Sequence, residues 1–281
     1  TWTLKLRQGV RWSNGDRFNA DDVVYNITRW LDPRVGSSNL GLFDAMVTAT
    51  DTGQRGPDGQ PVLSKSMSTG AVEKLDDYTV RLHLNRPVLA MPENLYHYPC
   101  AIVHRRFDDM GADLSKHPIG TGAFTLKTFV VGEKCVLVKR PTRDYWGPEV
   151  YLDTITYIDH GDDPSAHLAA LASKQVDMVH EVGVESLPGV EGLPHVVLQE
   201  VVTAQTGVAR MQVTHKPFDN VGVRQAVQLC MDQRRLLELA HRGKGAPAEH
   251  HHVAPSQPDY ATLPPPQQDH AHARQLLAQA G

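Results

Sequence analysis

The sequence predicts a mixed α/β or α+β protein of about two domains. The chain has 281 residues, and a single domain typically takes about 150. Hydrophobic residues make up 41% of the chain, which is enough for a folded core rather than a disordered polymer. Segments with strand-like alternation and segments with helix-like apolar stripes follow one another, with hairpins and crossovers between them.

The N-terminal region predicts a strand, a tight turn and a helix. Apolar and polar residues alternate over Thr1–Leu6, as in a half-buried strand. Asn14-Gly15 then predicts a hairpin turn, in which both central residues need a positive φ. Asn19 is placed to cap a helix whose first turn is acidic. One face of this helix is apolar and consists of Val23, Ile27, Trp30 and Leu31.

The middle of the chain predicts a long loop followed by strand pairs. Residues 50–70 are rich in Gly, Ser, Thr and Pro, which is typical of a loop. Ala71–Leu84 predicts a hairpin, and Gly122–Phe129 with Lys134–Lys139 predicts a second pair of strands. Alternation over Tyr151–Ile158 predicts one more strand.

Helices dominate the predicted C-terminal part. A short helix is predicted over Asp163–Ala172, because its proline falls at the first helical position. Val176–Val179 predicts a short buried strand. One long helix is predicted over Val221–Arg242, and a last helix begins at Asp269.

Composition excludes several classes of protein. The chain has 28 Lys and Arg against 32 Asp and Glu, a net charge of −4, whereas a nucleic-acid partner calls for a basic face. No apolar run approaches the ~18 residues of a membrane span, so we predict no stable membrane insertion of this segment. Cys100, Cys135 and Cys230 are few and odd in number, which argues against a disulfide framework.

No catalytic motif is found in the sequence. It has no Gly-x-Ser-x-Gly elbow, and His180-Glu181 lacks the second histidine of a zinc-protease motif. We therefore predict no enzyme, no catalytic residue and no cofactor. His250–His252, His270 and His272 offer imidazoles that suit a divalent metal. Adjacent histidines on an extended segment point alternately, however, and no acid or Cys completes the set, so we predict no metal site.

Four segments of the chain together resemble a known family. They are Leu4–Val24, Pro118–Phe124, Ala170–Val179 and Pro217–Ala226, and their order and spacing match over nearly the whole chain. The chain resembles the extracytoplasmic solute-binding proteins of family 5, the peptide/nickel ABC-transporter class with its dipeptide- and oligopeptide-binding proteins. The resemblance implies an α/β, two-lobed, periplasmic-binding-protein-like (class II) scaffold with an extra small domain, present here as an incomplete fragment.

The resemblance also implies a division into three parts. Residues 1–117 correspond to the small extra domain, incomplete at its N-terminus. Residues 118–213 form part of the first main lobe, and residues 214–281 are the truncated start of the second main lobe. Family members carry an export signal and continue well past Gly281, so we expect an internal fragment.

The implied function is that of an extracytoplasmic receptor of an ABC importer. Two lobes close around a short peptide or a peptide-like polar or anionic solute, opine-like or sugar-like solutes included, which is then delivered to the ABC transporter permease. The implied location is periplasmic or extracytoplasmic, with membrane association in a Gram-positive host. A nickel or metal-chelate receptor on the same scaffold is the alternative. A hydrolase or metalloenzyme is a third hypothesis, which the missing motifs disfavour.

A segment of the small domain is the first candidate for solute contact. In the family this segment follows the first helix, and here it offers Ser37, Ser38, Asn39 and Phe43. An amide supplies both a donor and an acceptor, which favours Asn39. The alternative is an ordinary Gly/Ser loop that leads into a helix. Tyr96–Tyr98 and His104 approach the cleft in some relatives, although packing is the default expectation for the tyrosines.

The second candidate segment matches a family strand that usually carries aromatic residues facing the cleft. Here residues 205–212 lack aromatics and offer Gln205, Thr206 and Arg210. Thr206 and Arg210 share one face of the expected strand by its period of two. Arg210 is suited to grip a carboxylate or phosphate with two hydrogen bonds, so we expect polar rather than aromatic recognition. The alternative is a solvent-exposed charge on a strand.

Overall fold

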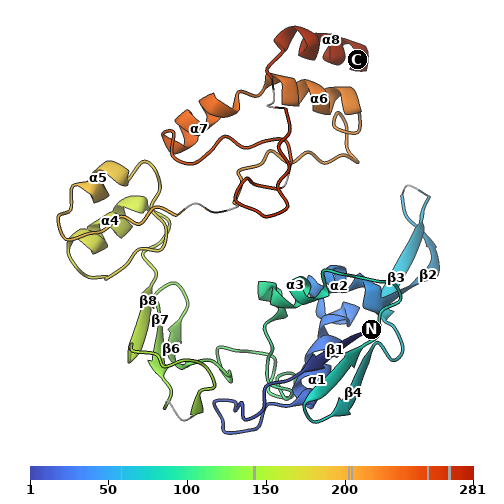
Figure 1. Ribbon diagram of the computed structural model, residues 1–281, viewed down its shortest axis with the longest axis vertical. Helices are drawn as coiled ribbons and strands as arrows, with labels where there is room; N and C mark the ends of the chain where they lie inside the picture. Colours follow the sequence, from blue (N-terminus) through green and yellow to red (C-terminus); the bar gives the residue numbers. More distant parts are fainter. Residues whose placement is uncertain (58, 142–143, 202, 204, 252, 265–266) are drawn as a thin grey trace. The chain divides into compact units, whose positions relative to one another are not determined.

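The computed structural model describes residues 1–281 apart from 58, 142–143, 202, 204, 252 and 265–266. The chain divides into two compact units, Thr1–Asp159 and His160–Gly281, which we call the N-terminal and C-terminal units (Figure 1). The predicted boundaries after residues 117 and 213 remain predictions, because the two units are defined by compactness alone.

A small antiparallel sheet forms the base of the N-terminal unit. Its strands are β1 (Trp2–Lys5), β5 (Thr79–Leu82) and β4 (Val72–Asp76), in that order, with Trp2 opposite Leu82. The predicted first strand and the predicted hairpin at 71–84 are therefore confirmed. Helix α1 (Ala20–Trp30) packs against β4 and β5.

Helix α1 begins with the predicted cap. Asn19 Oδ1 accepts a hydrogen bond from the Asp21 N–H (3.0 Å), and Asp22 Oδ2 accepts one from the Asn19 N–H (3.0 Å). Asn19 and Asp22 form a capping box, and the bond from the Asp21 N–H adds to it, so N–H groups that a helix start otherwise leaves free are satisfied. Asp22 is fully buried, and Trp12 Nε1 donates to its carboxylate (3.2 Å).

The Asn14-Gly15 turn differs from the prediction in its backbone. Arg11 and Arg17 pair across it as an isolated bridge, and Gly15 alone of the two central residues has a positive φ, 92°. Asn14 instead accepts a hydrogen bond from the Asp16 N–H through its side chain (3.1 Å). This local bond stabilises the turn, so Asn14 does not need the left-handed backbone conformation.

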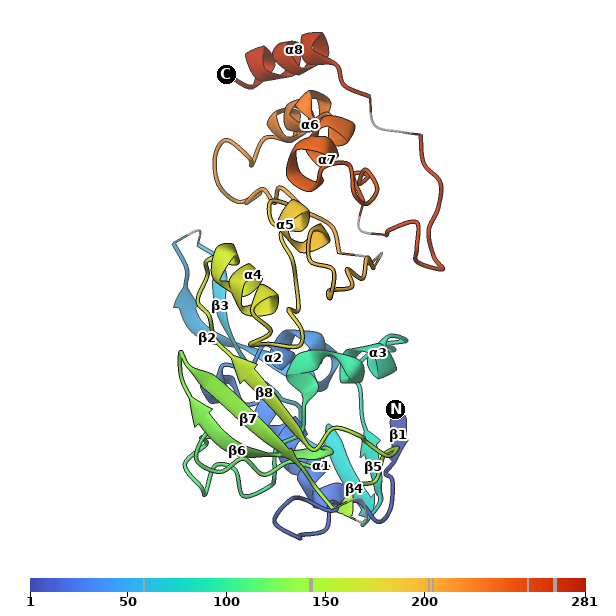
Figure 2. The same cartoon turned by 90° about the vertical axis from the view of Figure 1, so that its left-hand side faces the viewer.

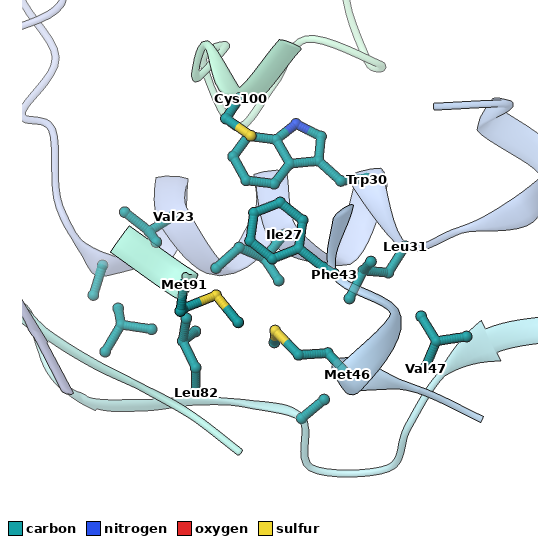
Figure 3. Packing of buried hydrophobic residues seen from close by; sticks show 13 residues of the cluster. Val23, Ile27, Trp30, Leu31, Phe43, Met46, Val47, Leu82, Met91 and Cys100 are labelled. Atoms are coloured by element: carbon teal, nitrogen blue, oxygen red, sulfur yellow. The ribbon is translucent and has the colours of Figure 1, made fainter. Parts of the chain in front are cut away.

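The apolar face of α1 is the centre of the hydrophobic core (Figure 3). Its predicted residues Val23, Ile27, Trp30 and Leu31 are all buried. The short helices after α1 add further large side chains, and Trp30 stacks on Phe43 with ring centroids 5.9 Å apart. These short elements are η1 (Pro33–Val35), α2 (Asn39–Leu42), η2 (Asp44–Met46), α3 (Met91–Tyr96) and η3 (Tyr98–Cys100).

The predicted loop at residues 50–70 is wrong, because much of it is a β-hairpin. Strands β2 (Val47–Arg55) and β3 (Pro61–Met67) pair antiparallel, with Val47 opposite Met67 (Figure 1). Nearly every residue of this arm is exposed, and Val47 is its one buried position among the described residues. Because both faces of the arm meet solvent, its sequence lacks the alternation that marks a half-buried strand.

A second antiparallel sheet completes the N-terminal unit. Its strands are β6 (Phe124–Val130), β7 (Lys134–Lys139) and β8 (Thr154–Ile158), and they lie side by side in that order (Figure 2). The predicted strand pair and the predicted strand within 151–158 are confirmed.

Helices are the only regular elements in the described residues of the C-terminal unit, and the rest of it is irregular. The predicted short helix is confirmed as α4 (Pro164–Ala172), with Asp163 as its N-cap, and α5 (Leu187–Glu191) follows. The predicted strand at Val176–Val179 is wrong, since this stretch is irregular. Val176, Met178 and Val179 are apolar, but a strand also needs a neighbouring strand to pair with, and none pairs with them in the described residues.

The predicted long helix at 221–242 is two helices, α6 (Val221–Cys230) and α7 (Gln233–His241). Met231 is extended (ψ 128°), and Asp232 Oδ1 accepts a hydrogen bond from the Arg235 N–H (2.9 Å). Asp232 therefore acts as a new N-cap in the middle of the apolar pattern. The predicted last helix is confirmed as α8 (His270–Ala280), which packs on α6. No helix in the described part of the chain is long and apolar enough to span a bilayer.

The hydroxyl of Tyr25, on α1, makes the stability of the N-terminal unit depend on pH. Burial and then the hydrogen bond from its hydroxyl to Asp108 Oδ2 (2.5 Å) raise the pKa of Tyr25 to about 12. Unfolded tyrosine ionises near pH 10. Neutral Tyr25 therefore stabilises the folded state fully below pH 10, and this contribution is lost as the pH rises towards 12.

We expect the stability of wild type to fall more steeply than that of Tyr25→Phe between pH 10 and 12. Denaturant unfolding of both proteins at a series of pH values measures this difference. Parallel pH profiles for the two proteins would contradict the raised pKa.

Candidate solute-binding segments

The segment after α1 separates into surface and core residues. Ser37 Oγ accepts a hydrogen bond from the Asn39 N–H (3.2 Å), and Ser38 is exposed just before α2. Both serines therefore lie at or near the surface of the N-terminal unit. Their hydroxyls can donate and accept hydrogen bonds, as solute contact requires.

Asn39 and Phe43 lie in the core, which corrects their predicted place on a solute-facing loop. Asn39 is 0% exposed, its Nδ2 donates to Pro99 O (2.8 Å), and its Oδ1 accepts from Cys100 Sγ (3.4 Å). Phe43 is 2% exposed and stacks on Trp30. The amide ties α2 to η3, because a buried polar group is stable only when it is hydrogen-bonded.

Residues 205–212 do not form the predicted strand. The backbone is irregular there, and Gln205, Thr206 and Arg210 are all exposed. The Gln205 N–H donates to Thr203 Oγ1 (3.2 Å). Without a strand, the shared face of Thr206 and Arg210 has no structural basis. Each of the three still presents its side chain to solvent, and the Arg210 guanidinium has no recorded ion pair in the described part of the chain.

The tyrosines at 96 and 98 are exposed, so the expectation that they pack is wrong. Tyr96 is 93% exposed and Tyr98 is 86% exposed, and the His97 ring lies 4.9 Å from the Tyr98 ring. The two phenol rings are therefore solvent-exposed and close in sequence, a surface feature that the sequence alone did not predict. His104 is 2% exposed instead, and it contacts Trp12 edge-on.

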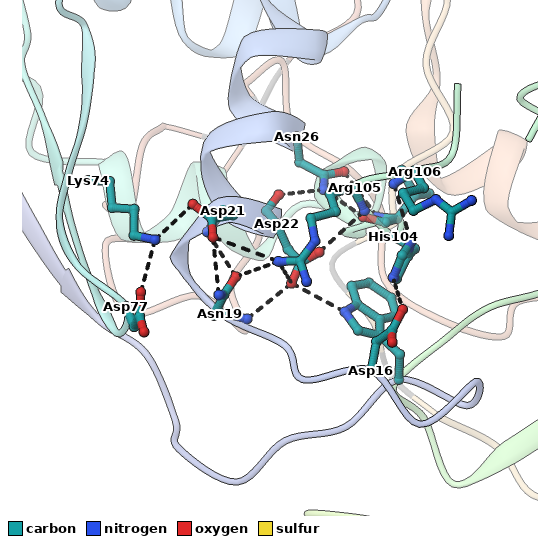
Figure 4. Close-up of polar contacts among 12 residues, drawn as sticks. Asp16, Asn19, Asp21, Asp22, Asn26, Lys74, Asp77, His104, Arg105 and Arg106 are labelled. Carbon is teal, nitrogen blue, oxygen red and sulfur yellow. Dashed lines mark hydrogen bonds and ion pairs between the residues drawn. The ribbon is translucent and has the colours of Figure 1, made fainter. Parts of the chain in front are cut away.

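A polar network connects residues 103–105 to α1 and to the turn and cap that precede it (Figure 4). His104 Nε2 lies 3.1 Å from Asp16 Oδ2, and Asn26 both donates to Val103 O (2.7 Å) and accepts from the Val103 N–H (3.0 Å). Arg105 Nη1 donates to Asn19 Oδ1 (2.8 Å). These bonds satisfy buried polar groups, so we assign the network to structure rather than to chemistry.

Arg140 joins two of the segments that carry the family resemblance. It is 6% exposed, and its Nη1 donates to the carbonyls of Gly120 (3.4 Å) and Gly122 (3.0 Å). Its Nη2 donates to Trp12 O (3.4 Å) and, in addition, to the carbonyls of Arg11 (3.2 Å) and Asp144 (2.9 Å). One guanidinium therefore links the turn at 11–15, the loop at 118–124 and the end of β7.

The histidines do not gather at a common point in the described residues. His250 Nε2 lies 2.9 Å from Gln233 Nε2, while His251 Nε2 contacts the Glu249 carboxylate. His252 lies outside the described residues. Among the residues that the structure describes, no group of three or more His, Cys, Asp or Glu is placed to hold a metal ion.

Comparison with known proteins identifies the class. The model of the bacterial extracellular solute-binding proteins, family 5 Middle, matches residues 1–281. Di/tripeptide-binding protein 1 of Pseudomonas aeruginosa is 27% identical over 301 residues, a match that covers 100% of this chain and 52% of that protein. Glutathione-binding protein GsiB of Shigella boydii is 28% identical over 284 residues, covering 100% of this chain and 50% of that protein.

A solved structure shows the same fold. The ABC transporter-associated periplasmic binding protein DppA from Helicobacter pylori, in complex with the peptide STSA, matches with a TM-score of 0.76 and 23% identity. The match covers 99% of this chain and 54% of DppA. The predicted α/β scaffold of the two-lobed periplasmic-binding-protein type is thereby confirmed.

This chain belongs to the bacterial extracellular solute-binding proteins of family 5. It spans about half the length of the relatives it matches.

Proposed function

We propose that this protein is an extracytoplasmic solute receptor that delivers short peptides, or peptide-like polar and anionic solutes, to an ABC transporter permease. The observation that carries the proposal is the match of the family model to all 281 residues. The relatives at 27–28% identity are named for di- and tripeptides and for glutathione. Such solutes are small, polar and carry free carboxylates, which sets the expected chemistry of recognition.

The exposed polar candidates supply groups suited to these solutes. Ser37 and Ser38 offer hydroxyls in the N-terminal unit, and Gln205, Thr206 and Arg210 offer an amide, a hydroxyl and a guanidinium in the C-terminal unit. A guanidinium recognises the planar carboxylate through two parallel hydrogen bonds. Arg210 is therefore the proposed anchor for a carboxylate of the solute.

Calorimetry on the full-length protein tests this proposal with a panel of peptides, glutathione, opines, sugars and nickel chelates. We expect a short peptide or glutathione to bind best and to be recovered unchanged. Loss of a charged hydrogen-bonded contact in Arg210→Ala should weaken the best solute by roughly 10- to 150-fold. Arg234→Ala is the matched control, because Arg234 is also exposed in the C-terminal unit.

Equal affinity of wild type and Arg210→Ala would remove Arg210 from the proposed contacts. Tight binding of nickel alone, abolished when His250 and His251 are replaced, would favour the metal receptor instead. Conversion of the solute to a product would contradict a receptor without turnover.

A further inference from the structure

A cavity that is open to solvent and lined by aromatic side chains lies in the N-terminal unit, and none of the candidate solute-binding residues lines it. Its volume is about 200 Å³. Three rings line it, those of Trp12, Phe18 and Trp146, together with Val10 and Ile102. The lining comes from the loop between β1 and α1, from the chain after η3 and from the chain after β7. These segments are distant in sequence, so the cavity exists only in the folded unit.

The rings around the cavity are held in place. Trp12 Nε1 donates to Asp22 Oδ2 (3.2 Å), and the Trp12 and Phe18 rings meet edge-on with centroids 6.0 Å apart. Trp146 Nε1 donates to Thr121 O (3.0 Å). Each indole is therefore fixed by a hydrogen bond at its polar edge. Trp146 is 45% exposed and presents apolar surface to the cavity, whereas Trp12 is 1% exposed and forms the buried part of its wall.

One cation stands at this cavity. Arg7 lines it, and the Arg7 guanidinium carbon lies 5.1 Å from the centroid of the Trp146 ring. The guanidinium has no recorded carboxylate partner within the described part of the chain. Stacking on an indole occupies the face of a guanidinium and leaves its N–H groups at the edge free to donate. The cavity thus combines an aromatic wall with a solvent-exposed cation.

We propose that this cavity binds a small aromatic carboxylate. An apolar cavity of about 150 Å³ accommodates benzene, so the volume here suffices for a phenyl ring. The ring packs against Phe18 and Trp146, the two accessible aromatic side chains, since aromatic pairs prefer edge-to-face and offset contacts. The carboxylate pairs with Arg7 through two hydrogen bonds. An apolar pocket with a few converging polar groups is the usual form of a small-molecule site. This site goes beyond the proposed transport function and does not depend on it.

Calorimetric titration with 3-phenylpropionate and its neutral analogue 3-phenylpropanamide tests the proposal. Wild type is expected to bind the acid at least about fivefold more tightly than the amide, because only the acid pairs with the guanidinium. In Arg7→Gln, affinity for the acid should fall about tenfold while affinity for the amide stays unchanged.

Arg106→Gln is the matched control, because Arg106 is an exposed arginine that does not line the cavity, and it should bind both compounds as wild type does. The wild-type comparison of acid and amide remains decisive even if Arg7→Gln folds poorly. Absence of binding, equal affinity for acid and amide, or an equal loss in Arg106→Gln would overturn the proposal. None of these results bears on peptide binding, so the two proposals fail separately.

Discussion

Replacing Arg140 by methionine is expected to lower the free energy of unfolding of the N-terminal unit by about 3–5 kcal/mol. Methionine keeps an unbranched apolar side chain but has no N–H groups. Five backbone carbonyls, which now accept from the two guanidinium nitrogens, would lose that donor. Buried acceptors without a partner cost about 1–3 kcal/mol each, and those nearer the surface recover water.

Denaturant unfolding, followed by the fluorescence of Trp12 and the other tryptophans, measures this loss. Lys139→Met is the matched control, because Lys139 is the preceding residue, is only half-buried and has no recorded hydrogen bond from its ammonium in the described residues. It should change stability by less than about 1 kcal/mol. A similar small change for Arg140→Met would contradict the role of Arg140 as the link between these segments.

Truncating Phe43 to alanine is expected to destabilise the N-terminal unit by about 3–5 kcal/mol. Phe43 is 2% exposed and stacks on Trp30 in the cluster built on α1 (Figure 3). Removal of the ring deletes apolar contacts and leaves a cavity that neighbouring side chains fill only in part. Thermal and denaturant unfolding give the magnitude.

Phe43→Leu separates this core role from the solute contact that the sequence predicted. Leucine retains most of the buried volume, so the expected loss of stability is about 1–2 kcal/mol. Affinity for the best solute should match that of wild type, since the side chain does not reach the surface. A tenfold or larger loss of affinity in a protein that remains folded would restore Phe43 to the binding residues.

Local signals explain which parts of the fold were predictable. The cap at Asn19, the apolar face of α1 and the paired strands β6 and β7 each depend on residues close in sequence. The arm formed by β2 and β3 was missed because solvent on both faces removes the alternation that identifies a strand. The division of the helix at Met231 was missed because the cap at Asp232 lies within a continuous apolar pattern.

The candidate site was harder to predict, because contacts with residues distant in sequence decide which side chains are buried and which are exposed. Asn39 and Phe43 occupy a Gly/Ser-rich stretch that looks like a loop, yet their partners include Pro99, 60 residues further along the chain. The exposed Tyr96 and Tyr98 stand in a stretch that reads equally well as packed. Sequence periodicity describes one element at a time and carries no signal for contacts between elements.

Native mass spectrometry of the full-length protein, purified from its host without added ligand, tests the central claim most directly. The account predicts a protein ion that carries one small organic molecule, which on release proves to be an intact short peptide or a peptide-like anionic solute. A protein that carries a metal ion alone, or an organic molecule that is neither peptide-like nor anionic, would contradict the account.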